Sequence, residues 1–383
     1  MAKLCAMISA SYKQGAPRLN RSSSNRLKNN YLHRESLLGL STSELCQLVE
    51  SLGEPAFHGR QIYRAIYGRR CFNFEEMTDL STGLRERLSA VALINLPRPH
   101  TTQISVDGTR KYLLELSDGQ KIESVFIPEE RRNTLCISTQ VGCPMECRFC
   151  LTALLGFTRN LTVGEIVGQI FLILKDRGTD QASSSEPVNI VLMGMGEPLL
   201  NFDNVTKALA LMADPQGMGI SPHRITLSTV GLVPKITALG KAAVVPNLAI
   251  SLSATTDEVR DRLMPINKKY PIGTLLQACA QFPLRRSQRI TFEYVLIAGV
   301  NDRDEDARRL VKLLSPLRSK VNLLALNPGK EGLRPSSPER VKGFQELLSS
   351  RGLPVTIRRP RGADIFAACG QLHRAESAFR LIH

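Results

Sequence analysis

One stretch of ten residues constrains this chain more than any other. Residues 141–150 read VGCPMECRFC and contain Cys143, Cys147 and Cys150. Three thiolates in so short a loop can converge on one inorganic centre, but zinc and iron–sulfur sites usually take four protein ligands. Three cysteines leave one position open, which favours a reactive centre over a structural one. Two alternatives are a zinc site that borrows a distant fourth ligand and reduced cysteines with only a structural role.

Composition limits the class of protein and its partners. The 383 residues are 43% hydrophobic, enough for one large domain and a small one. A formal net charge of +15 favours a polyanionic partner, most simply nucleic acid, although a solvated basic surface explains it equally well. Nine cysteines, three of them clustered, do not resemble a secreted disulfide framework and favour a reducing compartment. No apolar run approaches the length of a membrane span.

The first hundred residues predict an extension and a small helical domain. Residues 1–40 are basic and rich in serine, which predicts a disordered extension; a transit peptide, an RNA-touching arm and an over-long start remain alternatives. Residues 41–100 predict three helices, near 41–49, 59–67 and 82–93. This domain is either an RNA-contacting module or a packing domain with a solvated basic face, because it carries several arginines: Arg60, Arg64, Arg69, Arg70, Arg85 and Arg87.

The remainder predicts β-structure that becomes β/α. Two Asp-Gly turns, at 107–108 and 118–119, predict a three-stranded meander within residues 101–133. Between residues 134 and 358 apolar strands alternate with helical patterns, which predicts an α/β domain with parallel strands. A carboxyl-terminal loop and tail, 359–383, follows. The predicted parallel strands are 134–139, 188–193, 224–229, 247–252, 289–297, 320–326 and 354–357.

Polar residues and glycines gather where these strands end. In parallel β/α folds the active site lies at the carboxyl ends of the strands. The cysteine loop follows the first strand, and Gly196 and Glu197 follow the second, where a carboxylate can accept from an ammonium group. Singly, such residues often only close turns. Together they predict one ligand site, which also takes in Ser228 after the third strand, residues 251–253 after the fourth and Asn327 after the sixth.

Four motifs carry a resemblance to a known family. They are residues 140–150 (QVGCPMECRFC), 156–161 (GFTRNL), 193–201 (MGMGEPLLN) and 367–372 (AACGQL). From Ser41 onward the chain resembles the RlmN/Cfr family of radical S-adenosylmethionine (SAM) RNA adenine methyltransferases. The resemblance implies a partial (β/α)6-type TIM-like barrel, preceded by the small helical domain and the β-meander extension.

The resemblance also implies two cofactors and the residues that hold them. Cys143, Cys147 and Cys150 would hold one [4Fe–4S] cluster, and two SAM molecules would be used per turnover. Many members carry His at the position of Ser253; serine can hydrogen-bond but does not titrate near neutrality, so the SAM contact at this position stays open. The SAM-binding residues implied are Gly196, Glu197, Ser228, Ser251, Leu252, Ser253 and Asn327.

Three further residues match the family's catalytic positions. Cys369 would accept a methyl group as a thiolate. After that methyl is activated and joined to adenine, Cys136 would attack the sulfur of Cys369, forming a disulfide and releasing the product. Glu123 would accept the proton of the ring C–H, which requires hydrogen-bond reach.

The predicted function is methylation of adenosine C2 in 23S rRNA, and also in tRNA. Methylation of adenine C8 by the same machinery is the nearest alternative, because the motifs do not separate the two. An RNA-binding protein with a structural metal, and a radical SAM enzyme acting on proteins or small molecules, are alternatives from other classes. The implied partners are 23S rRNA, tRNA and an electron donor such as flavodoxin or ferredoxin, for a cytoplasmic monomer.

Overall fold

The computed structural model describes residues 34–130, 132–178, 188–327 and 332–372. It divides into two units, residues 1–95 and residues 96–383. The predicted basic extension lies outside the described residues up to position 33. Residues 34–40 are described, and they extend the first unit beyond its predicted start at residue 41.

The first unit is a small helical unit, as predicted. Helix α3 (Thr42–Ser51) begins with a capping box between Ser41 and Glu44, which satisfies main-chain donors at its first turn. Helix α4 (Phe57–Tyr63) runs into a π-helical turn, Arg64–Gly68, and α5 (Thr82–Val91) follows. The predicted second helix is therefore interrupted. Strand β1 (Glu35–Ser36) pairs in parallel with β2 (Ala92–Leu93), so both ends of the unit meet.

The basic side chains of this unit are only partly available. Arg69 pairs with Asp79 at 2.9 Å, and Arg87 pairs with Glu54. Arg60 and Arg64 are exposed. They are the arginines of this unit best placed to meet a polyanion.

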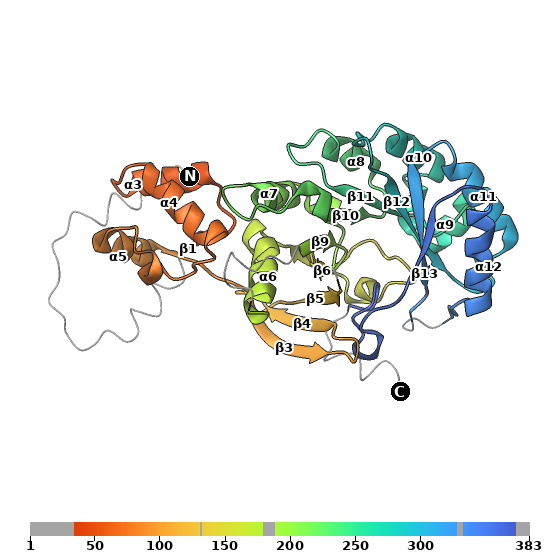
Figure 1. The fold of residues 1–383 in the computed structure, drawn as a ribbon, viewed down its shortest axis with the longest axis horizontal. Helices are drawn as coiled ribbons and strands as arrows, with labels where there is room; N and C mark the ends of the chain where they lie inside the picture. The colour runs from red at the N-terminus through yellow and green to blue at the C-terminus, as the bar shows by residue number, and fades with distance from the viewer. Residues whose placement is uncertain (1–33, 131, 179–187, 328–331, 373–383) are drawn as a thin grey trace. The chain divides into compact units, whose positions relative to one another are not determined.

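A ten-stranded sheet organises the described part of the second unit (Figure 1). Its order is β14-β13-β12-β11-β10-β9-β6-β5-β4-β3. The seven strands from β6 to β14 are parallel and follow chain order, and the sheet stays open, which confirms the predicted partial barrel. These strands are β6 (Arg132–Cys136), β9 (Val188–Leu192), β10 (Ile225–Thr229), β11 (Asn247–Ser251), β12 (Ile290–Leu296), β13 (Ser319–Ala325) and β14 (Val355–Arg358).

The meander is part of the same sheet rather than a separate layer. Strands β3 (Arg98–Ile104), β4 (Arg110–Glu115) and β5 (Lys121–Glu129) are antiparallel, and β5 pairs with β6 at the barrel's edge. The predicted hairpins are present. The continuity with the barrel was not predicted, because antiparallel pairing of β5 and β6 has no signal beyond a short connection between them.

Helices connect the parallel strands and lie along the outer side of the sheet (Figure 1). Their apolar faces pack on strands whose own side chains are buried, such as Leu227, Ile250 and Phe292. The short helix α8 (Val233–Leu239) was not predicted, because it lacks the side-chain N-cap that marks the start of the equally short α9 (Asp257–Leu263). None of the helices in the described ranges is long and apolar enough to cross a membrane. The helices are α6 (Val163–Asp176), α7 (Phe202–Ala213), α8 (Val233–Leu239), α9 (Asp257–Leu263), α10 (Ile272–Ala280), α11 (Asp304–Leu314) and α12 (Pro338–Ser349).

Candidate active site

The cysteine loop is closed at its base by a small hairpin that the sequence did not predict. Strand β7 (Gln140–Gly142) pairs with β8 (Phe157–Asn160), and the Cys143 amide donates to the Gly156 carbonyl at 2.7 Å. Gly142 has φ of +77°, and a Cβ there would lie 1.9 Å from the Gly156 oxygen. Only glycine fits this position. The two ends of the loop are thus pinned together, and its thiols are displayed between them.

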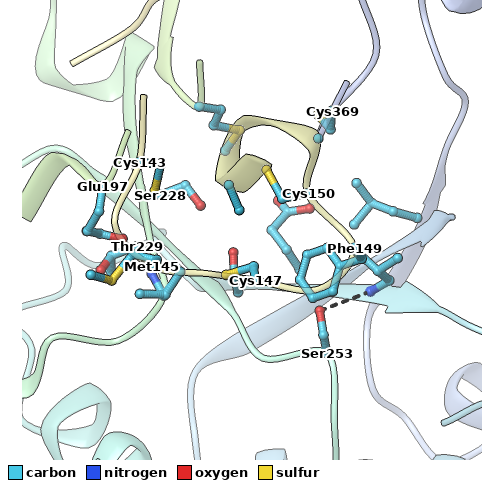
Figure 2. A pocket seen from close by; sticks show the side chains of 18 of the residues that line it. Cys143, Met145, Cys147, Phe149, Cys150, Glu197, Ser228, Thr229, Ser253 and Cys369 are labelled. Carbon is cyan, nitrogen blue, oxygen red and sulfur yellow. Dashed lines mark hydrogen bonds between the residues drawn. The ribbon is translucent and has the colours of Figure 1, made fainter. Parts of the chain in front are cut away.

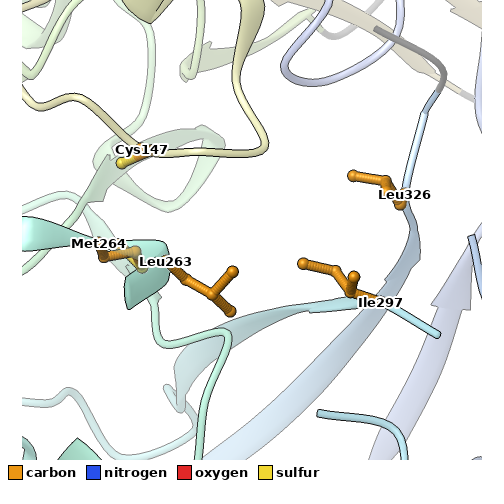
Figure 3. Packing of buried hydrophobic residues seen from close by; sticks show 5 residues of the cluster. All are labelled: Cys147, Leu263, Met264, Ile297 and Leu326. Carbon is orange, nitrogen blue, oxygen red and sulfur yellow. The ribbon is translucent and has the colours of Figure 1, made fainter. Parts of the chain in front are cut away.

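The three cysteines of the loop line one cavity of about 160 Å³ (Figure 2). Cys147 is buried and belongs to a cluster of buried hydrophobic residues with Leu263, Met264, Ile297 and Leu326 (Figure 3). Burial raises the pKa of all three thiols: that of Cys143 to about 12, that of Cys147 well above its usual value and that of Cys150 above it. Bound to nothing, they would be neutral. A cationic centre that binds thiolates offsets this cost, so the donor set fits an iron–sulfur cluster.

Among the described residues, no group of three or more His, Cys, Asp or Glu side chains is arranged to hold one metal ion. A cluster spreads its thiolate ligands over several iron atoms and therefore needs them further apart than a single zinc ion does. Cys143, Cys147 and Cys150 line one shared cavity, as the ligands of a cluster would.

The cavity brings together most residues that the sequence predicted for SAM. Leu252 is the exception: it is buried and does not line the cavity. Ser253 is also buried, has φ of +48° and accepts from the Val295 amide at 3.4 Å. The predicted residues that do line the cavity are Gly196, Glu197, Ser228, Ser251, Ser253 and Asn327.

Glu197 is a buried carboxylate in the cavity wall, where it can accept from a cationic group of a ligand. It is buried and accepts from the main-chain amides of Leu199 at 3.0 Å and Val230 at 2.9 Å. Burial nevertheless raises its pKa to about 7, because two amide donors only partly replace lost water. A bound ammonium group would favour the ionised form.

Arg260 holds the strand ends in place, and sequence reasoning missed it. This side chain is fully buried and donates to three main-chain carbonyls at the ends of β10 and β11. The acceptors are Val230 at 2.7 Å, Ser251 at 3.2 Å and Leu252 at 3.2 Å. Arg260 therefore sets the main-chain geometry on which Ser251 and Ser253 depend.

The carboxyl-terminal segment docks directly on the cysteine loop. The Leu151 amide donates to the Gly370 carbonyl at 2.7 Å, and the Thr152 hydroxyl donates to the Leu372 carbonyl at 2.7 Å. Asn327 donates to the Cys369 carbonyl at 2.9 Å. These bonds place Cys369 in the wall of the cysteine-lined cavity, on the side away from Glu197 (Figure 2).

Cys369 also lines a second, smaller cavity of about 30 Å³, and Cys136 lines it too. Burial raises the pKa of Cys136 to about 12, and the nearby Cys369 adds to this, while Arg358 opposes it. Arg358 lines both cavities. The structure thus brings Cys136, Cys369 and the three loop cysteines into adjoining spaces, although they are far apart in sequence.

Glu123 is not in either cavity. It is buried on β5, and its carboxylate pairs with Lys111 at 3.1 Å. Lys111 also donates to the Phe366 carbonyl at 3.4 Å, in the segment that carries Cys369. The structure connects Glu123 to that segment through Lys111 and does not bring it to the cysteines.

Comparisons with known proteins agree with this geometry. Residues 137–311 match the model of the radical SAM superfamily, and residues 35–94 match the ribosomal RNA large subunit methyltransferase N-terminal domain. A crystal structure of a radical SAM methyltransferase from Sphaerobacter thermophilus superposes with a TM-score of 0.83, at 40% identity, over 88% of this chain and 99% of that one. The fold and the site therefore define a radical SAM enzyme.

Relatives narrow this class. A probable dual-specificity RNA methyltransferase RlmN of Koribacter versatilis is 47% identical over 345 residues, which cover 86% of this chain and 99% of the relative. The dual-specificity RNA methyltransferase RlmN of Geobacter sulfurreducens is 51% identical over 337 residues, or 87% of this chain and 91% of the relative. The chain belongs to the RlmN family of radical SAM RNA methyltransferases. Membership implies a [4Fe–4S] cluster and SAM, which the cysteine loop and the cavity fit.

We predict that Arg260→Met lowers the free energy of unfolding by about 3 kcal/mol, because three buried carbonyls lose their donor. Denaturant unfolding measures this. Arg262→Met on the same helix is the control, since Arg262 is exposed, and it should change stability by less than about 0.5 kcal/mol. Equal effects of the two substitutions would contradict the role given to Arg260.

We predict that SAM binding weakens as the pH falls below about 7, roughly tenfold per pH unit, because the ligand's ammonium group needs the ionised form of Glu197. Anaerobic equilibrium dialysis on the cluster-loaded protein measures this, with iron content checked at each pH. Glu197→Gln should bind SAM more weakly at high pH and lose this dependence. A parallel decline in both proteins would show that another group titrates.

Proposed function

We propose that the chain methylates C2 of an adenosine in 23S rRNA and of an adenosine in tRNA, through a methyl group carried on Cys369. The observation that carries this proposal is the position of Cys369. It forms a wall common to two cavities, one lined by the loop cysteines and the SAM residues and the other by Cys136. This position suits a residue that takes a methyl group from SAM in the first cavity and is attacked by Cys136 from the second.

Cys369 acts first, as a nucleophile. Its thiolate takes the methyl group of one SAM, and the buried Arg358 guanidinium interacts with Cys369 electrostatically. Two SAM molecules are then used per turnover, one as methyl donor and one at the cluster. When bound, the cluster and SAM supply the 5′-deoxyadenosyl radical that removes hydrogen from the methyl carbon. The carbon on Cys369 then adds to C2 of the adenine ring, joining enzyme and RNA. The unpaired electron left on the ring would return to the cluster, and the C2 proton would pass to Glu123, which restores the aromatic ring.

Cys136 acts last. Its thiolate attacks the sulfur of Cys369, so an S–S bond forms and the bond from that sulfur to the transferred carbon breaks, its electron pair leaving with the base. A proton completes the new methyl group. Burial raises the pKa of Cys136, so this step depends on Arg358 to stabilise the thiolate.

Glu123 is the proposed acceptor of the ring proton. Its buried ion pair with Lys111 keeps it away from the cavities, so this role requires the pair to open when RNA is bound. Because Lys111 also bonds the segment that carries Cys369, movement of that segment is a route to opening.

The RNA partner is supported by family and charge together. The net charge of +15 and the exposed Arg60 and Arg64 suit phosphate contacts. A reduced flavodoxin or ferredoxin would supply electrons, and the enzyme would act as a cytoplasmic monomer. Methylation of adenine C8 is the less favoured alternative, since the relatives carry the RlmN name.

The product's identity tests the proposal. Cluster-loaded enzyme, SAM and reductant are incubated with unmodified 23S rRNA fragments and with tRNA, and the nucleosides are analysed by mass spectrometry. We expect 2-methyladenosine from both RNAs and none with Cys369→Ala. Detection of 8-methyladenosine alone would overturn the regiochemistry. If the protein binds RNA but forms no deoxyadenosine from SAM, the proposed enzymatic activity is wrong and an RNA-binding protein with a structural metal is favoured.

We predict that Cys136→Ala traps the enzyme on its RNA, because no thiolate remains to cleave the bond to Cys369. A denaturing gel should show a slowly migrating protein–RNA species whose peptide contains Cys369. Cys279→Ala is the matched control, since Cys279 is also a buried free cysteine but lies on α10, away from both cavities. Release of methylated RNA by Cys136→Ala at the wild-type rate would contradict the proposed step.

A further inference from the structure

A buried carboxylate in the cavity has no assigned role. Glu293 lies on β12, is only 7% exposed and lines the cavity that Cys369 also lines. Asn322 donates to its Oε1 at 3.0 Å, which fixes the carboxylate. Its Oε2 is buried and has no hydrogen-bond partner within the described part of the chain. A buried acceptor without a donor is costly, so this oxygen is suited to a ligand donor.

The positive charge of Arg358 lies near the Glu293 carboxylate but does not form an ion pair with it. Arg358 lines the same cavity, and the one hydrogen bond of its side chain among the described residues is to the Met193 sulfur, at 3.6 Å. The strongest electrostatic interaction of its guanidinium is with Cys369, and weaker ones are with Glu293 and Cys136. The described residues show no ion pair between Arg358 and Glu293 within 4.0 Å. An acceptor and a donor therefore face the same space without closing on each other.

We propose that Glu293 and Arg358 read the edge of the target adenine, with the Glu293 carboxylate accepting from the N6 amino group and the Arg358 guanidinium donating to N1. This inference rests on the proposed function. Adenine presents a donor beside a ring-nitrogen acceptor, which complements a carboxylate beside a guanidinium. Enzymes that act on a base take it out of the stack and read its edge in this manner.

The order of the groups places the reacting carbon. Along the Watson–Crick edge N6, N1 and C2 follow one another. In the protein Arg358 lies near both Glu293 and the cysteines Cys369 and Cys136. A base bonded by Glu293 and Arg358 in this order directs C2 toward Cys369. The pair would thus select adenine and position the carbon that is methylated.

The other candidate ligand for Glu293 is SAM itself. The cation-binding end of the SAM site is at Glu197, whose oxygens are already engaged by two amides. Glu197 and Cys369 lie on opposite sides of the cavity, with Cys147 and Cys150 between them in this view (Figure 2). Arg358 is on the Cys369 side, where it reaches the second cavity as well. SAM also carries an adenine with the same edge, so the SAM dissociation constant of Glu293→Gln decides between the two ligands: an unchanged constant assigns the pair to the RNA base.

The test removes one hydrogen-bonding group from the RNA and one from the enzyme. A short RNA substrate carries adenosine, purine riboside (without N6) or 7-deazaadenosine (without N7) at the target. Wild-type enzyme and Glu293→Gln are compared by kcat/KM, and SAM dissociation constants are measured for both proteins. Because Asn322 holds the amide oxygen, Gln places its NH2 group where Oε2 lies and presents a donor to N6. Glu346→Gln, exposed on α12, is the matched control.

We expect wild-type enzyme to prefer adenosine over purine riboside by about 10- to 100-fold and to accept 7-deazaadenosine nearly as well as adenosine. Glu293→Gln should lose a similar factor on adenosine, lose most of the preference and retain its SAM affinity. Glu346→Gln should match the wild type throughout.

Three results would overturn the inference. They are a wild-type enzyme that does not distinguish purine riboside from adenosine, a large loss with 7-deazaadenosine, and a Glu293→Gln enzyme that binds SAM weakly while losing equally on every RNA. The wild-type substrate series remains decisive even if Glu293→Gln does not fold. Failure of the wild type to form any 2-methyladenosine from the adenosine RNA would instead refute the proposed function.

Discussion

The docking of the carboxyl-terminal segment on the cysteine loop is the interaction on which the rest of the site depends. Leu151 and Thr152, the two residues that follow the loop, bond the carbonyls of Gly370 and Leu372, and Asn327 bonds that of Cys369. The loop therefore positions Cys369 at the same time as it displays its own thiols. In this docked position Cys369 lines both cavities at once.

Burial determines the electrostatics of this site. Low polarity around the three loop cysteines, Cys136 and Glu197 raises their pKa values, so each favours a cationic partner. The guanidinium of Arg358 is one such partner, and the proposed site adds the cluster and the ammonium group of SAM. Arg260 is a buried cation rather than a buried acid. It donates to main-chain carbonyls at the strand ends, and these bonds hold the strand ends in place. The cavity is thus assembled from groups that are costly alone and stable only with ligands or with one another.

The sequence predicted what depends on chain order and missed what depends on packing. Parallel strands end at one edge of a sheet, so Glu197, Ser228 and Ser251 could be placed together from their positions after strands. Arg260 stands in a charged helical stretch that reads as solvent-facing, and Glu293 is a single carboxylate in an apolar strand. Their burial comes from neighbours distant in sequence. For the same reason the ion pair that holds Glu123 on Lys111, outside the cavities, had no signal in the sequence.

The central claim is that Cys369 carries the methyl group. It is tested most directly by mapping cysteine modifications by peptide mass spectrometry, after the cluster-loaded protein is incubated anaerobically with SAM and reductant but without RNA. The account predicts a methyl group on Cys369 and an unmodified Cys136. An unmethylated Cys369 in protein that then methylates added RNA, or a methyl group found on another cysteine instead, would contradict it.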